Sequence, residues 1–244
     1  MITYLINDNL DCFYTAIFTA YEQKNLGAKI TAVSFQPTFG EISLPILPSI
    51  EKSTRVQNSL LKIAGRTVLD DIKISLLSCD EQKHNKAFEY VKLILTEQKD
   101  VSTYFSHPAV MQFTELKNKV WLERHRFTGF LRFHETISGV LYAVYEPDND
   151  VTEILAPFFK ARLNKNPFII HDIRRNKFAL WSGIEMRYIT TNEVPSIILS
   201  DKEVAVRELW KKYFAHVNID ERPHKKQQDS YLPRRYRKYM NEFF

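Results

Sequence analysis

The sequence predicts an α+β fold, with a mainly helical N-terminal half packed against a mostly antiparallel sheet in the C-terminal half, closed by a long amphipathic helix and a basic tail. Apolar residues recur at helical spacing from about residue 53 to residue 125, whereas short apolar runs bounded by turn residues follow between 129 and 189. The chain of 244 residues contains 17 Phe and 12 Tyr but only six Gly, which is the composition of an ordered protein with an ample core.

The N-terminal half opens with a short strand and continues in helices. Residues 2–6 are the expected strand, and Asn9 can cap a helix that ends near Gln23. Residues 29–50 contain three prolines around Gly40, which predicts one or two short extended pieces in a loop. The other helices of this half are expected at about 53–64, 66–78, 83–97 and, with Pro108 in its first turn, 108–125.

The C-terminal half is rich in strands. Residues 129–133 and 140–145 predict a hairpin, because both are short apolar runs and a turn sequence separates them. Asp150 and Glu153 have the spacing of a capping box for a helix to about Leu163. Further strands are expected at 167–172, 178–181 and 184–189, then a helix at 200–217, a polar, partly extended stretch at 220–230 and a short helix at 233–239.

The predicted helix at 200–217 is amphipathic. Its large apolar residues recur at helical spacing, and we expect them to face the core of the protein. They are Val206, Leu209, Trp210, Tyr213 and Phe214.

Three regions are expected along the chain: a strand–helix and helical region at 1–100, an α+β core at 101–217 and a basic tail at 218–244. One compact domain is the alternative, because no Gly/Ser-rich linker separates these regions. The start lacks the features of a signal peptide, and no stretch approaches the roughly 18 apolar residues that a membrane helix needs. With two isolated cysteines, Cys12 and Cys79, these features predict a cytoplasmic protein.

The net positive charge is concentrated near the C-terminus. Residues 207–238 hold ten Lys and Arg against four Asp and Glu, a net +6, whereas the whole chain carries +5. Tyrosines and a tryptophan are interleaved with these cations, which favours a partner rich in phosphate, with rings on which bases can stack. The alternative is a solvated helix face followed by a basic tail.

Familiar catalytic and cofactor signatures are absent from the sequence. All six glycines are isolated, so there is neither a phosphate-binding glycine loop nor a dinucleotide fingerprint. The acidic stretch 146–150 lacks the glycine and the distal glutamate of a calcium loop. We therefore expect no metal and no cofactor.

Two polar clusters remain as candidates for chemistry. The first surrounds Arg132, which we expect in an interior strand where it needs an anion or, alternatively, a structural salt bridge to an acid. The second is His171 and Asp172 at the end of an apolar strand, followed by Arg174 and Arg175 at an exposed turn. Neighbouring strand residues point to opposite faces, so His171 and Asp172 form a dyad only if the strand bends, and Asp172 can instead open the turn.

Four segments together resemble a known family over nearly the whole chain. They are His125-Arg126-Phe127-Thr128-Gly129-Phe130-Leu131-Arg132-Phe133, Tyr142-Ala143-Val144-Tyr145-Glu146-Pro147-Asp148, Ile169-Ile170-His171-Asp172-Ile173-Arg174-Arg175 and Leu232-Pro233-Arg234-Arg235-Tyr236. This series is similar to a bacterial family known only as DNA-metabolism or DNA-repair proteins, whose core is a domain of unknown function. The resemblance implies a neighbouring gene for a radical S-adenosylmethionine (radical-SAM) protein with a DNA-modification role. In some members, it also implies fusion to a uracil-DNA-glycosylase-like domain. The chain departs from the family at Arg237 and His224, where an aromatic residue and Asn are expected.

The leading hypothesis is a cytoplasmic DNA-binding accessory protein that works with the radical-SAM partner, although RNA is an alternative ligand. Tyr236 or Tyr231 would stack on a base. The phosphate contacts would come from Lys225, Lys226, Arg234, Arg235 and Lys238.

Two other hypotheses stay open. The first is a DNA hydrolase, glycosylase-like or nuclease-like, with His171 as general acid or base and Asp172 or Asp148 as its carboxylate partner or as a metal ligand. Its phosphate clamp would be Arg132, Arg174 and Arg175, and it requires His125, Arg132, Asp148 and His171 to meet in one cleft. The second is a scaffold protein whose basic tail holds an acidic protein partner.

Overall fold

The computed structural model describes residues 2–33, 42–193, 196–217 and 225–243. The chain divides into two compact units, Met1–Trp121 and Leu122–Phe244, and the division falls inside a single helix, α5 (Pro108–Phe130). Helices predominate in the N-terminal half and a five-stranded mixed sheet lies in the C-terminal half, so the predicted α+β class is confirmed. In the described part of the chain, no helix is both long and apolar enough to cross a membrane.

The first unit is built around a small parallel sheet, which the sequence did not reveal. Strand β1 (Ile2–Ile6) is its centre and pairs in parallel with β2 (Lys29–Ala32) and β3 (Ile42–Ile46). The predicted cap is confirmed, because the Asn9 side chain accepts a hydrogen bond from the Cys12 N–H at 2.8 Å. Residues 34–41 of the predicted loop lie outside the described residues.

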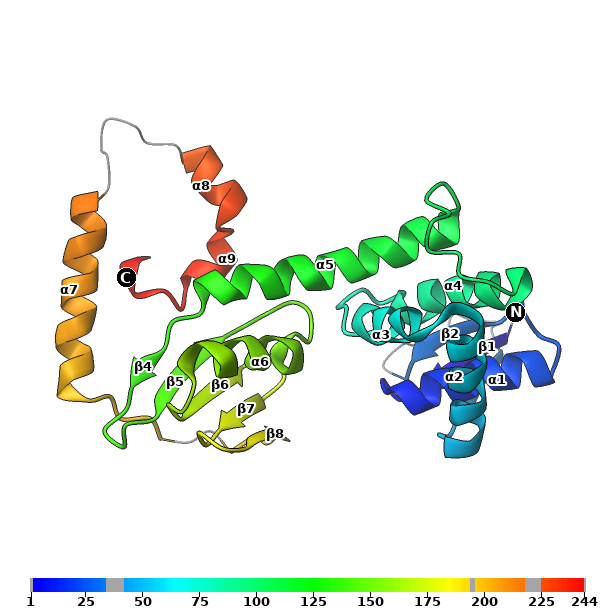
Figure 1. The fold of residues 1–244 in the computed structure, drawn as a ribbon, viewed down its shortest axis with the longest axis horizontal. Helices are drawn as coiled ribbons and strands as arrows, with labels where there is room; N and C mark the ends of the chain where they lie inside the picture. The colour runs from blue at the N-terminus through cyan, green and yellow to red at the C-terminus, as the bar shows by residue number, and fades with distance from the viewer. Residues whose placement is uncertain (1, 34–41, 194–195, 218–224, 244) are drawn as a thin grey trace. The chain divides into compact units, whose positions relative to one another are not determined.

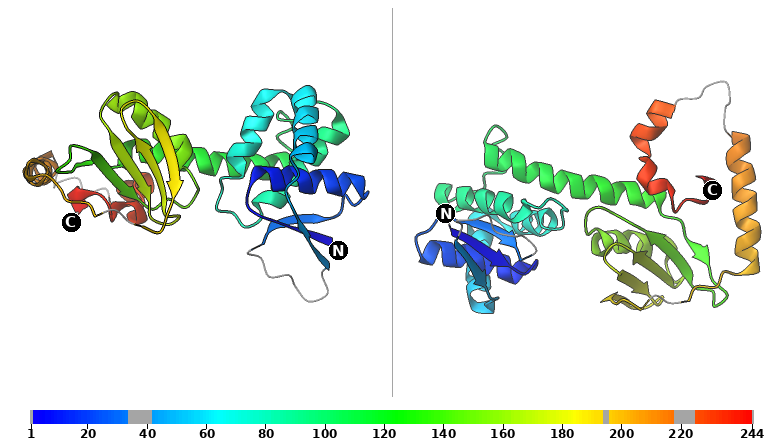
Figure 2. Two further views of the ribbon diagram at one scale, coloured as in Figure 1. Left: turned by 90° about the horizontal axis from the view of Figure 1, so that it is seen from below. Right: turned by 180° about the vertical axis from the view of Figure 1, so that it is seen from behind.

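Helices pack around this sheet, and Figure 2 shows α1 alongside it. The contact between α1 and α2 is the most extensive between helices of this unit. Tyr90 and Phe113 stack with ring centroids 3.9 Å apart in the core. The helices are α1 (Leu10–Glu22), α2 (Ile50–Ala64), α3 (Arg66–Ser75), α4 (Lys83–Glu97) and the first part of α5.

The second unit contains a five-stranded sheet in the order β4-β5-β6-β7-β8 (Figure 1). Every pair of neighbours is antiparallel except β5 and β6, which are parallel and are connected through α6 (Thr152–Leu163). Helix α6 packs against β6 and β7. The strands are β4 (His134–Glu135), β5 (Leu141–Tyr145), β6 (Phe168–Asp172), β7 (Lys177–Trp181) and β8 (Met186–Thr190).

The expected strand at 129–133 was wrong. Helix α5 continues to Phe130, and the residue pair that forms a hairpin with β5 is β4. The helix continues because Phe127 extends its buried stripe and packs edge-on against Tyr145 and Tyr236, both at 4.8 Å between ring centroids. A short apolar run does not by itself distinguish a strand from a buried helical turn.

The capping box at Asp150 was also wrong. Helix α6 begins at Thr152 and has no side-chain cap. Asp150 instead accepts hydrogen bonds from the Lys177 ammonium group at 2.9 and 3.1 Å. The Asp150 carboxylate therefore forms an ion pair with Lys177, which is distant in sequence, instead of capping the helix.

The C-terminal segment consists of α7 (Asp201–Val217), α8 (Lys225–Tyr231), α9 (Arg234–Arg237) and the short 3-10 helix η1 (Asn241–Phe243). The long helix at 200–217 and the short one at 233–239 are confirmed. Of the stretch 220–230, which we expected to be partly extended, residues 225–230 are helical and residues 220–224 lie outside the described residues. Helix α7 packs against β4 and η1. The expectation that its large apolar residues face the core was wrong, because Val206, Leu209 and Tyr213 are more than half exposed and Trp210 and Phe214 are more than a third exposed.

Candidate nucleic-acid interface

The turn after β5, residues 146–148, brings together cations from two distant segments. The Asp148 carboxylate lies 3.0 Å from the Arg174 guanidinium and 2.9 Å from that of Arg235. Arg174 follows β6, and Arg235 belongs to α9. The fold thus places two of the predicted phosphate-binding arginines on one carboxylate.

Asp172 shapes the turn that carries Arg174 and Arg175. Its fully buried carboxylate accepts the backbone N–H of Arg174 at 2.9 Å and that of Arg175 at 3.3 Å. The Arg175 guanidinium then bonds Asp172 at 2.9 Å and the carbonyls of Pro147 and Asp148. Burial raises the pKa of Asp172, and these contacts make it the residue that fixes the two arginines.

Lys238 and Tyr239 approach the same turn from the C-terminal segment. Both donate to Oε2 of Glu146, the hydroxyl of Tyr239 at 3.1 Å. The hydrogen bond from Lys238 lowers the pKa of Glu146. Lys238 therefore lies with Arg174 and Arg235 at the end of the sheet where strand β5 ends.

Tyr236 lies inside the second unit rather than on its surface. It is 3% exposed, and its hydroxyl donates to Oε1 of Glu123 at 2.7 Å. Burial raises the pKa of Tyr236 to about 12, so the hydroxyl keeps its proton. Its ring is covered by Phe127 and by the guanidinium of Arg235 at 4.8 Å, which leaves no free face for a base. Tyr236 anchors α9 to α5.

Glu123 belongs to the polar cluster that precedes Arg132 in the sequence, but the sequence analysis gave it no role. Besides Tyr236, it accepts the backbone N–H of Asp148 at 2.9 Å, that of Asn149 at 2.7 Å and the Asn149 side-chain amide at 2.6 Å. The signal in the sequence was its position, since Glu123 continues the buried helical stripe of Val120 and Phe127. A carboxylate on such a buried stripe requires hydrogen-bond donors from other parts of the protein.

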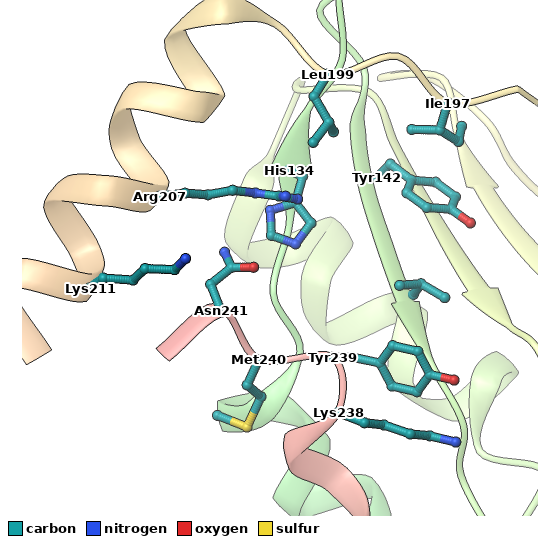
Figure 3. Close-up of a pocket in the computed structure, with 11 residues that line it drawn as sticks. His134, Tyr142, Ile197, Leu199, Arg207, Lys211, Lys238, Tyr239, Met240 and Asn241 are labelled. Carbon is teal, nitrogen blue, oxygen red and sulfur yellow. The ribbon is translucent and has the colours of Figure 1, made fainter. Parts of the chain in front are cut away.

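A cavity of about 400 Å³ opens beside this turn, between β4, β5, α7 and the C-terminal segment (Figure 3). Arg207 and Lys211 reach toward it from α7, and Lys238 lies at its other side. It is lined by cations, by rings and by an apolar wall. The cations and rings are Arg207, Lys211, Lys238, His134, Tyr142 and Tyr239.

One wall of the cavity is held by a buried ion-pair network. Glu203 of α7 bonds Nδ1 of His134 at 2.7 Å, the Glu135 N–H at 3.0 Å and Nε of Arg207 at 3.3 Å. Burial lowers the pKa of His134 more than Glu203 raises it. Burial also opposes ionisation of Glu203, yet these hydrogen bonds leave its pKa below the ordinary value. The network joins α7 to β4 and orients Arg207 at the cavity.

His171 lies within the sheet, behind Tyr142. Its Nδ1 is 2.7 Å from the Tyr142 hydroxyl, and its ring stacks on Phe178 at 4.0 Å between centroids. Burial lowers the pKa of His171, which favours the neutral ring in its hydrogen bond with Tyr142. The structure thus couples His171 to the cavity through Tyr142 and gives Asp172 a different role in the turn.

Arg132 has a separate acid partner. Its guanidinium bonds Glu242 at 2.6 Å and the carbonyl of Gly129 at 2.7 Å. Arg132, Asp148 and His171 therefore each bond to a different group and not to one another. This placement is the structural salt bridge that we gave as the alternative for Arg132.

The remaining predicted cations lie on the helices α8 and α9. Arg234 pairs with Asp229 at 2.9 Å and has a side chain that is 79% exposed. Lys226 and Tyr231 are exposed, whereas the side chain of Lys225 lies outside the described residues. Exposed ion pairs contribute little to stability, so these cations stay available to an anionic ligand.

Net charge differs between the two units. The first contains 13 Lys and Arg against 13 Asp and Glu, and the second contains 21 against 16, which gives 0 and +5. All of the excess positive charge is therefore on the unit that contains the cavity.

Comparison with known proteins gave one match. The family described as a domain of unknown function, DUF4130, matches residues 81–242, which is most of the chain. No curated protein and no solved structure matches.

Proposed function

We propose that this chain, which belongs to the DUF4130 family of domains of unknown function, is a DNA-binding protein whose second unit holds the nucleic acid. The observation that carries the proposal is the convergence of Arg174, Arg235 and Lys238 around residues 146–148, beside a cavity lined by cations and aromatic rings. Cations for the backbone and rings for the bases are the two requirements of single-strand binding.

The three converging cations suit phosphate contacts. The side chains of Arg174, Arg235 and Lys238 are each about half exposed although each touches a carboxylate. Such pairs are worth only about 0–1 kcal/mol, so phosphate oxygens can replace or join the carboxylates at little cost. Arginine also offers a planar fork that matches a phosphate. These contacts would give affinity and little sequence discrimination.

The cavity suits an unpaired nucleotide. Its volume of about 400 Å³ lies within the usual range of small-ligand sites, roughly 300–1,000 Å³. Tyr142 and Tyr239 supply aromatic faces, and Arg207 and Lys211 supply positive charge on the opposite side. Because Tyr236 is buried, Tyr239 takes the stacking role in this proposal. Single-stranded or locally unpaired DNA is therefore the favoured ligand over intact duplex.

The biological setting rests on the sequence resemblance. It supports an accessory role in DNA metabolism or repair, in the cytoplasm, with a radical-SAM protein as the partner that performs chemistry. The proposal assigns the chain itself the binding of DNA and leaves the reaction to that partner. The hydrolase hypothesis is not favoured, because Arg132, Asp148 and His171 bond to separate partners and not to one another.

The proposal is tested by fluorescence anisotropy with labelled single-stranded DNA, duplex DNA and RNA over a range of salt concentrations. We expect tighter binding of single strands and a log–log salt slope near −0.7 for each phosphate contacted. The double variant Arg174→Ala/Arg235→Ala should bind at least tenfold more weakly, with a slope reduced by about 1.4 for two lost contacts. Absence of binding by the wild-type chain at low salt would refute the proposal.

Two matched controls sharpen this test. Arg187 is a more exposed arginine that pairs with Glu185 at 2.7 Å and lies on β8, so Arg187→Ala should leave the affinity unchanged. Tyr239→Ala should weaken single-strand binding by about 1–3 kcal/mol, whereas Tyr239→Phe keeps the ring and most of the affinity. RNA bound more tightly than DNA would transfer the proposal to RNA. Equal losses for Arg187→Ala and the double variant would reduce it to non-specific charge attraction.

A further inference from the structure

Helix α7 carries an apolar stripe on its outer face. Val206, Leu209, Tyr213 and Val217 follow one another at spacings of three and four residues, so they share one side of the helix. Each of them is between 56% and 65% exposed. Contiguous apolar surface of this kind is unusual on a monomer and marks interaction sites.

The other side of α7 holds the helix on its unit. Trp210 donates its indole N–H to Glu242 at 3.2 Å, and Phe214 contacts Phe243 with ring centroids 5.7 Å apart. Glu203 fastens the first turn to His134. The helix is therefore docked without the apolar stripe, and no described residue buries the stripe.

The charges that border the stripe are three basic side chains and Glu208, whose carboxylate pairs with Lys211 at 3.6 Å. Lys202 is one turn before Val206, Lys212 lies on the outer flank, and His216 extends that flank. Among the described residues, neither Lys202 nor Lys212 has a carboxylate within 4 Å. The surface thus combines apolar anchors with positive charge that lacks an intramolecular partner.

We propose that the apolar stripe of α7 docks an amphipathic helix with acidic flanks from another protein. Apolar side chains at i, i+3, i+4 and i+7 are the anchors by which helices recognise each other in grooves and coiled coils. Glutamate or aspartate beside those anchors would pair with Lys202 and Lys212 and would set the orientation. The 17 residues of α7 span about 25 Å, which a partner helix of about five turns would cover.

Charge and chemistry favour this occupant over two others. A second copy of the chain whose α7 packs in parallel would place Lys202 and Lys212 near the same lysines, which is unfavourable. DNA would use the lysines but would leave Val206, Leu209 and Val217 without a function. Arg207 and Lys211 turn toward the cavity from the opposite side of α7, so the protein partner and the nucleic acid can bind at the same time.

The test uses two synthetic helical peptides of 18 residues that share a leucine stripe at three- and four-residue spacing. One carries glutamates on both flanks and the other carries lysines. With the full chain and fluorescein-labelled peptides, we expect the acidic peptide to bind at least tenfold more tightly than the basic one. Leu209→Ser should weaken its binding at least tenfold, and Lys202→Glu/Lys212→Glu should reverse the preference between the peptides.

Each alternative has its own signature. Equal binding of both peptides, or binding of neither, would overturn the proposal. A dimer by light scattering that Leu209→Ser converts to monomer would overturn it in favour of a second copy. Loss of DNA affinity in Lys202→Glu/Lys212→Glu without any change for the peptides would assign the face to nucleic acid. Circular dichroism of Leu209→Ser verifies that this exposed substitution leaves the fold intact.

Discussion

Replacing Glu123 with glutamine is the sharpest test of how the site is held together. The Glu123 carboxylate is 3% exposed and accepts four hydrogen bonds, from Tyr236, the Asp148 N–H and two groups of Asn149. Glutamine keeps one acceptor oxygen, and its amide group then faces two donors. Two lost hydrogen bonds to a charged group, at about 1.5–3 kcal/mol each, predict a loss of about 3–6 kcal/mol in the free energy of unfolding.

Tyr236→Phe provides the graded comparison. It removes one donor and leaves three on the Glu123 carboxylate, so we expect a loss of about 1.5–3 kcal/mol. In a double-mutant cycle the two changes should be strongly non-additive, because both act on the same hydrogen bond. A coupling energy near zero would show that the two side chains contribute independently.

Urea unfolding followed by far-UV circular dichroism measures these losses. The control is Glu115→Gln on the same helix, where the exposed Glu115 pairs with Lys119 at 2.7 Å, and its unfolding midpoint should match that of the wild type. Glu123→Gln should also weaken DNA binding, since Asp148 positions Arg174 and Arg235. A stability loss below about 1 kcal/mol in Glu123→Gln, or one smaller than that of Tyr236→Phe, would refute the reasoning.

Three more tests concern the acid titration of Asp8, a substitution at the tight turn of Gly183 and the buried His171. Burial opposes ionisation of Asp8, but hydrogen bonds from His84 and a neighbouring lysine lower its pKa to about 2. The stabilisation of the folded state by ionised Asp8 is therefore present above pH 4 and disappears as the pH falls through 2. Because half of the side chain is exposed, Asp8→Asn should remove only about 1 kcal/mol of it in urea titrations. Gly183 has φ of +91° and a Cβ there would lie 2.6 Å from the Lys165 carbonyl oxygen, so Gly183→Ala should destabilise by more than about 1 kcal/mol in thermal unfolding. Burial lowers the pKa of His171, so stability should fall as the pH drops below 6.5, and His171→Phe should reduce that fall.

Elements set by local chemistry were predictable from the sequence. The strand at residues 2–6, the helix capped by Asn9 and the strands at 168–190 correspond to the structure within a few residues. Capping and hydrophobic periodicity depend on residues a few positions apart, so a single sequence contains that information. The expectation of a cation-rich C-terminal surface had the same local origin.

Elements set by long-range packing were not predictable in this way. Helix α5 continues past residue 125 because Phe127 finds Tyr145 and Tyr236 as packing partners. Likewise, helix α7 has the amphipathic pattern of a buried helix, yet the unit only partly covers Trp210 and leaves Leu209 65% exposed. The same apolar spacing serves a core and an interface, and only the surrounding structure distinguishes them.

The sequence by itself determined the types of most elements, the excess of positive charge near the C-terminus and the residues that could contact phosphate. The tertiary structure decided how those residues are used. It buried Tyr236, paired Arg132 with Glu242, and gathered Arg174 and Arg235 on Asp148 beside a cavity. The physical reason is range, because helix and strand preferences arise between near neighbours, whereas burial and ion pairing depend on which distant segments the fold brings into contact.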